Sequence, residues 1–114
     1  MPQDRSELLQ GTLELLVLKT LSVSPMHGWG VALRIEQMSR GTFAVNQGSL
    51  YPALQRMKRR GWIRSEWRIT ENKRRARYYL LTRAGVRQLA IERESWEHAY
   101  QAVNWVLGWE GGGS

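Results

Sequence analysis

The sequence predicts a mostly helical α+β fold, in which three helices precede a β-hairpin and one long helix completes the chain. Two observations predict it. Apolar residues recur at helical spacing in four segments, and aromatic and β-branched residues flank a polar turn between residues 62 and 81. The 114 residues suit a single domain, and the hydrophobic fraction of 42% is ordinary for a globular protein. We expect a small core that benefits from association with a second copy.

The expected elements follow one another as three helices, two strands and a final helix. The first helix carries a leucine-rich stripe that is wide enough to predict burial on more than one side. Pro25, Gly41 and Gly61 follow the ends of the first three helices, and Thr82 caps the last one. The expected ranges are residues 7–21, 28–38 and 46–60 for the first three helices, 62–69 and 76–81 for the strands, and 82–110 for the last helix.

Two residues compete for the N-terminal cap of the third helix. Asn46 is a good cap, but it would place Pro52 beyond the first turn, where proline removes a backbone hydrogen bond. Ser49 as the cap would keep Pro52 within the first turn, where the missing N–H costs nothing. The sequence leaves both alternatives open.

The positive charge of the chain is concentrated in its middle. The formal net charge is +7, yet residues 55–87 hold twelve basic and two acidic side chains, whereas residues 1–54 are neutral overall and residues 88–114 carry a net charge of −3. A segment of this kind predicts a polyanionic partner. The alternative is a solvated basic face that only keeps the protein soluble.

The order of the elements and the position of the charge together predict a winged helix-turn-helix fold. Its third helix enters the major groove of DNA and its hairpin reaches the backbone or the minor groove. The basic segment falls on these same two parts, so we expect double-stranded DNA as the partner. The predicted contacts are Asn46, Gln47, Ser49, Tyr51, Gln55, Lys58, Arg59, Lys73, Arg74, Arg75 and Arg77.

Several of these side chains have an alternative, purely structural interpretation. Asn46 or Ser49 would be the helix cap, and Tyr51 would pack against the hairpin. Arg77 would pair with Glu66 across the two strands. A module that binds RNA or single strands is disfavoured, because no sheet with exposed aromatic residues between basic ones is expected.

Five stretches of the sequence resemble the motifs of the PadR family of bacterial transcription regulators, in the same order. The resemblance implies a winged helix-turn-helix homodimer, a C-terminal helix that crosses to the partner subunit, and repression of nearby genes. We therefore expect a DNA-binding domain over residues 1–81, a dimerisation helix over 82–110 and a flexible tail over 111–114. The stretches are MHGWGV at 26–31, GSLYPAL at 48–54, RRGWI at 59–63, RRARYY at 74–79 and LTRAG at 81–85.

The last helix carries apolar residues at nearly heptad spacing, beyond what one small core needs. Among them, Trp96 follows Glu-Ser, and the resemblance implies a pore at the dimer interface where paired tryptophans bind planar aromatic effectors. The alternative is that Trp96 itself fills the space at the dimer interface and leaves no room for a ligand. Trp29, Trp62 and Trp67 are expected in the core or at the base of the hairpin. The predicted dimer interface is Leu9, Leu13, Leu16, Leu89, Trp96, Tyr100, Val103 and Leu107.

Other classes of function find no support in the sequence. His27 and His98 are isolated, and cysteine is absent, so no metal site and no cofactor are expected. No motif brings a nucleophile and a base together, so we do not expect an enzyme. No apolar run approaches the length of a membrane span, and the N-terminus does not resemble a secretory signal. A cytoplasmic location is expected.

Overall fold

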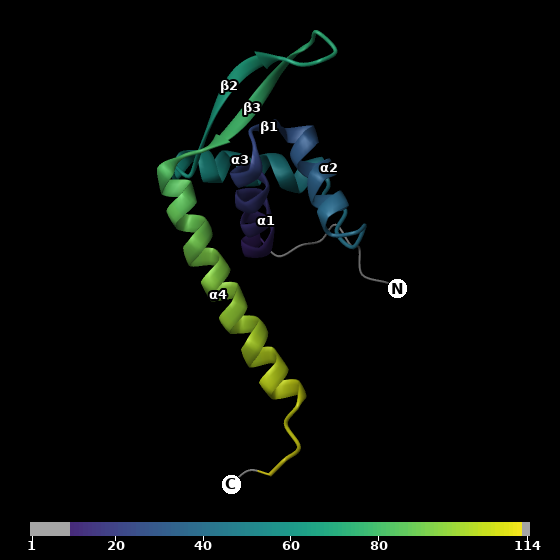
Figure 1. Ribbon diagram of the computed structural model, residues 1–114, viewed down its shortest axis with the longest axis vertical. Coiled ribbons are helices and arrows are strands. Elements are labelled where there is room, and N and C mark those ends of the chain that lie inside the picture. The colour runs from purple at the N-terminus through teal and green to yellow at the C-terminus, as the bar shows by residue number, and fades with distance from the viewer. Residues whose placement is uncertain (1–9, 113–114) are drawn as a thin grey trace.

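The computed structural model describes residues 10–112, and within this range it contains four helices and a three-stranded antiparallel sheet (Figure 1). The predicted α+β fold class is confirmed. The start expected for the first helix, at Glu7, lies outside the described residues. The elements are α1 (Gln10–Val23), β1 (Met26–His27), α2 (Gly28–Met38), α3 (Gln47–Arg59), β2 (Ile63–Ile69), β3 (Arg75–Leu81) and α4 (Arg83–Leu107).

The core lies where α1, α2 and α3 meet beneath the base of the hairpin. Each of the three helices buries one apolar side, and the hairpin adds Ile63 and Tyr79 to the same cluster. Leu13, one of the expected dimer-interface residues, is buried in this intrachain core. Leu9 lies outside the described residues. The fully buried side chains include Val17, Leu18, Val31, Ile35, Leu50, Leu54, Met57 and Ile63.

Asn46 is the N-cap of α3. Its side-chain oxygen accepts a hydrogen bond of 2.8 Å from the backbone N–H of Ser49, which settles the choice between the two residues. Pro52 consequently lies inside the helix, beyond its first turn, and it has no N–H to donate to the carbonyl of Gly48. The position is exposed, so water can reach the carbonyl.

A β-hairpin, which we call the wing, consists of β2, β3 and the turn between them, residues 63–81. The strand order is β1-β3-β2, and the register pairs Trp67 with Arg77. β1 is an element that the sequence did not predict, and its Met26 and His27 pair with Tyr79 and Tyr78 of β3. This short strand attaches the base of the wing to the start of α2, while the tip of the wing extends beyond the helices (Figure 1).

The junction between the wing and α4 is tightly built. The hydroxyl of Thr82 donates to the carbonyl of Trp62 at 2.9 Å and accepts from the N–H of Gly85 at 3.0 Å. A Cβ atom at Gly85 would collide with the carbonyl oxygen of Trp62 and with the side chain of Leu81. Only glycine allows this close approach, which fixes the direction in which α4 leaves the wing.

The far half of α4 extends away from the rest of the molecule (Figure 1). The radius of gyration is 16.6 Å, against the ~13 Å expected for a compact domain of this length. Leu89 is partly buried against the core, whereas Trp96, Tyr100, Val103 and Leu107 are exposed. The predicted division of the chain at residues 81 and 110 stays a prediction.

Candidate nucleic-acid interface

The solvent-facing side of α3 carries most of the contacts predicted for this helix. Leu50, Leu54 and Met57 fix the opposite side in the core. Of the contacts predicted for α3 and its cap, only Lys58 is half-buried. The exposed ones are Asn46, Gln47, Ser49, Tyr51, Gln55 and Arg59.

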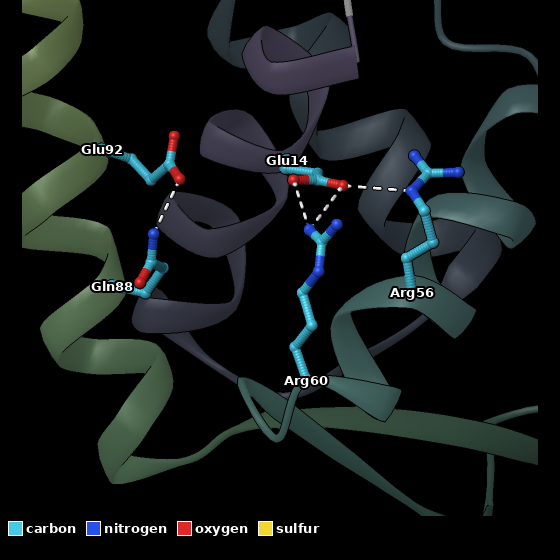
Figure 2. A network of polar contacts seen from close by, with 5 residues as sticks. All are labelled: Glu14, Arg56, Arg60, Gln88 and Glu92. Atoms are coloured by element: carbon cyan, nitrogen blue, oxygen red, sulfur yellow. Dashed lines mark hydrogen bonds and ion pairs between the residues drawn. The ribbon is translucent and has the colours of Figure 1, made fainter.

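Two arginines of the basic segment are used to hold α3 against α1. Glu14 points from α1 toward α3 and contacts Arg56 at 3.2 Å and Arg60 at 3.3 Å (Figure 2). The side chain of Glu14 is only 5% exposed, so the two guanidinium groups neutralise a nearly buried charge. In the sequence, Arg56 is one of the twelve basic residues of the segment 55–87, and nothing local marks it as a partner of α1. The signal that could have identified this contact is the single carboxylate, Glu14, within the apolar stripe of α1.

The wing has two faces of different electrostatic character. On the outer face, Glu66 accepts hydrogen bonds from Arg68 at 2.7 Å and from Arg64 at 3.1 Å. These hydrogen bonds, that from Arg68 first, lower the pKa of the Glu66 carboxyl below its ordinary value. Arg68 also lies over the ring of Tyr78. The single carboxylate of Glu66 therefore offsets part of the positive charge of the outer face.

The inner face of the wing carries Trp67, Arg75 and Arg77. Successive residues of a strand point to opposite faces, so the register that pairs Trp67 with Arg77 places Glu66 on the other side. The alternative in which Arg77 pairs with Glu66 is therefore wrong. The guanidinium groups of Arg75 and Arg77 instead lie 4.8 and 5.0 Å from the centre of the Trp67 ring.

Two of the expected core tryptophans are in fact exposed. Trp62 packs against the core as predicted, and Arg60 lies over its ring. Trp29 and Trp67 are 63% and 56% exposed, so the prediction that they lie in the core is wrong. Trp29 stacks on the ring of His27 beside the wing.

A groove of about 700 Å³ separates the inner face of the wing from the body of the molecule. Tyr51 of α3 lines it, with the ring lying against Gly28 at the start of α2 and with 40% of the residue exposed. The ring therefore packs partly on α2, and the hydroxyl is held beside the groove. Burial raises the pKa of the neighbouring Tyr79 phenol above its ordinary value. The wing residues in the groove are Trp67, Thr70, Asn72, Arg74, Arg75, Ala76, Arg77 and Tyr79.

Whether a cation of residues 55–81 has a carboxylate partner thus depends on where it lies in the fold. Those that face α1 or the outer side of the wing have carboxylate partners. Within residues 10–112, the remaining six make no ion pair, and three of them line the groove. These six are Lys58, Arg59, Lys73, Arg74, Arg75 and Arg77.

Comparison with known proteins identifies the family. The profile of the transcriptional regulator PadR-like family matches residues 17–91, from the middle of α1 into α4. The chain belongs to this family. The transcriptional regulator Rv3488 of Mycobacterium tuberculosis is 30% identical to it over 97 residues, which cover 85% of this chain and 87% of that protein.

Solved structures of PadR proteins share the fold of this PadR-family chain. A PadR-like transcriptional regulator from Bacillus cereus superposes with a TM-score of 0.77 at 30% identity and covers 92% of this chain and 100% of its own. A PadR family transcription regulator from Clostridium difficile gives a TM-score of 0.72 at 26% identity, with 84% and 98% covered. The winged helix-turn-helix prediction is confirmed by these similarities.

Membership of the PadR-like family establishes the broad function. The chain is a transcriptional regulator, and the prediction that it is not an enzyme is confirmed by the family. Among the described residues, no three metal-ligating side chains come together. No helix between residues 10 and 112 has the length and apolar character needed to span a membrane. The cytoplasmic location stays a prediction.

Proposed function

We propose that this regulator is a homodimeric repressor that binds a specific DNA sequence through α3 and the wing. The observation that carries the proposal is that the cations without an ion pair lie together on α3 and on the wing. The four arginines that face α1 or the outer side of the wing each form an ion pair with Glu14 or Glu66. The six cations without an ion pair lie on α3 and along the groove and tip of the wing. Phosphate groups provide the negative charge that this face lacks.

The two parts of the face have different roles in this proposal. The exposed side of α3 presents Gln47, Gln55 and the hydroxyl of Tyr51, groups that can hydrogen-bond to base edges in the major groove. The wing presents arginines and Lys73, which bind phosphates without reading sequence. We therefore assign specificity to α3 and general affinity to the wing.

Binding assays on single variants test this assignment. Arg74→Ala removes an unpaired arginine and should weaken binding to operator and random duplexes by the same factor, with a smaller dependence of log Kd on log salt. Arg64→Ala is the matched control, because it removes an arginine that already forms an ion pair with Glu66. This variant should change binding little. Equal effects of the two variants would contradict the assignment of phosphate binding to the groove side of the wing.

Tyr51→Phe tests the specifying role of α3. The variant removes only the hydroxyl and retains the ring that packs on Gly28. Its affinity for the operator should fall more than its affinity for a random duplex. Equal losses on both duplexes would show that Tyr51 does not read sequence.

Dimerisation through α4 is supported by an unpartnered apolar stripe. Leu89, Trp96, Tyr100, Val103 and Leu107 fall within an arc of about 60° when each residue turns the helix by about 100°. All but Leu89 are exposed in the single chain. A second copy would cover them and would double the DNA-binding face, as expected for an operator with two half-sites.

Sedimentation equilibrium tests the proposed dimer. Val103→Glu introduces a charge into the stripe, and Ile91→Glu introduces the same charge on the opposite side of α4, at a residue that is also exposed. We expect a dimer for wild type and for the Ile91 variant and a monomer for the Val103 variant. A monomeric wild type at micromolar concentration would refute the proposal.

Repression is the regulatory direction that the family resemblance favours. A dimer bound to a promoter would exclude the transcription machinery from it. Transcription in vitro from a promoter that contains the operator, identified by selection of bound duplexes from a random DNA pool, should fall as protein is added. A rise in transcript would identify an activator instead.

A planar aromatic effector is a second candidate function, and the surroundings of Trp96 favour it. Its ring stacks on that of Tyr100, with centroids 5.1 Å apart, and it lines a pocket of about 280 Å³ between α1 and α4. A planar cationic dye should quench tryptophan fluorescence saturably in wild type and in Trp105→Ala, but not in Trp96→Ala. Equal quenching in all three proteins would exclude this site.

A further inference from the structure

Trp67 occupies a position where packing does not require a tryptophan. It lies on the inner face of the wing, where it lines the groove, and it is not among the residues of the core cluster. More than half of its surface is exposed, although a ring of this size is costly to leave in water. The guanidinium groups of Arg75 and Arg77 both lie over its ring.

The register of the wing creates these contacts. Trp67 lies directly opposite Arg77, and Arg75 is two residues further along β3 on the same face. Two positive groups on adjacent same-face positions repel each other, and neither has a carboxylate partner among residues 10–112. The negative faces of the indole ring attract both groups and offset this repulsion.

We propose that Trp67 is a positioning residue that holds the side chains of Arg75 and Arg77 ready to bind DNA phosphates. The proposal rests on the proposed DNA-binding function of the wing. A guanidinium group stacked on a ring retains its N–H groups for other partners, because the contact uses its flat face. A carboxylate occupies donor groups and offsets the charge, as Glu66 does when it accepts from one nitrogen of Arg64 and one of Arg68 on the outer face. Trp67 thus orders two arginines without neutralising them.

Two conservative variants distinguish the effect of the aromatic face of Trp67 from the effect of its apolar volume. Trp67→Phe retains an aromatic face, whereas Trp67→Leu retains an apolar side chain without one. We expect Trp67→Leu to weaken binding to a duplex by about tenfold, because each subunit loses two cation–π contacts, and Trp67→Phe to recover most of the loss. Equal losses for the two variants, or no loss for Trp67→Leu, would overturn the proposal. Both should retain the thermal midpoint of wild type, since the ring lies outside the core.

The same substitution in an Arg75→Ala/Arg77→Ala background identifies how Trp67 acts. If Trp67 acts through these arginines, Trp67→Leu causes no further loss there. A loss of the same factor in both backgrounds would mean that Trp67 contacts DNA itself or supports the fold, which overturns the proposal. If the double arginine variant binds as wild type does, the wing assignment in the proposed function fails as well.

A measurement without DNA provides an independent test. The ring current of Trp67 should shift the side-chain Nε–H resonances of Arg75 and Arg77 in the NMR spectrum of the free protein. Those shifts should vanish in Trp67→Leu, while the resonance of Arg68, which lies over Tyr78 on the outer face, stays in place. Unshifted Arg75 and Arg77 resonances in wild type would contradict the proposed arrangement.

Discussion

Replacement of Glu14 by glutamine should destabilise the protein through the contact that holds α3 on α1. Glu14 is nearly buried, and it receives Arg56 and Arg60 from a segment more than forty residues away in the chain. Glutamine retains the size and one acceptor oxygen of the side chain but loses the charge. The variant therefore leaves two guanidinium groups beside a neutral amide.

The magnitude follows from the burial of the three side chains. A hydrogen bond to a charged group contributes about 1.5–3 kcal/mol, and Glu14 accepts from two arginines. The side chains of Arg56 and Arg60 are 25% and 46% exposed, so water compensates part of the loss. We expect the free energy of unfolding to fall by about 2 kcal/mol. For a chain of this length, that corresponds to a decrease of about 8 °C in the melting temperature.

Glu66 offers a matched control, because it also accepts hydrogen bonds from two arginines. Its side chain is 38% exposed, compared with 5% for Glu14, so Glu66→Gln should leave the melting temperature close to that of wild type. Urea unfolding followed by circular dichroism at equal protein concentration measures both variants. A change of less than about 0.5 kcal/mol for Glu14→Gln, or equal changes in the two variants, would refute the reasoning.

Three further predictions concern the junction, the groove and the core. Gly85→Ala should lower the free energy of unfolding by about 2 kcal/mol in urea titrations, because its Cβ would meet the backbone carbonyl of Trp62, which cannot move aside. Gly28→Ala should displace the ring of Tyr51, because the Tyr51 hydroxyl lies 2.7 Å from the position of the new Cβ atom. The affinity for the operator should therefore fall in fluorescence anisotropy titrations, while the melting temperature changes little. Burial raises the pKa of Tyr79 above 10.0, so its contribution to stability is complete below that pH and is lost as the pH rises through the folded-state pKa. Tyr79→Phe should abolish this part of the alkaline loss of stability.

Local patterns in the sequence were sufficient to predict most of the fold. The range of α2 and the positions of α3 and the wing follow from apolar spacing, caps and the polar turn, which are all properties of neighbouring residues. β1 escaped detection because a strand of two residues has no alternation to recognise. The choice of Asn46 as the cap of α3 depended on whether the helix tolerates Pro52 in its interior, which local rules leave open.

The site was harder to predict, because its chemistry depends on which residues meet across the fold. Arg56 appears in the sequence as one cation among many, and only the packing of α1 on α3 shows that it forms an ion pair with Glu14. Arg77 pairs with the ring of Trp67 rather than with Glu66 because of the strand register, and a shift of one residue would reverse the two faces. The sequence thus identifies the basic segment, while long-range contacts decide which of its charges stay available.

Selection of bound duplexes from a random DNA pool tests the central claim most directly. If α3 and the wing form one DNA-binding face and α4 pairs two copies of it, the recovered sequences should contain an inverted repeat. Its half-site centres should lie about one helical turn, or about 34–36 Å, apart. A pool that shows no enrichment, or that converges on a single unrepeated motif, would contradict the account.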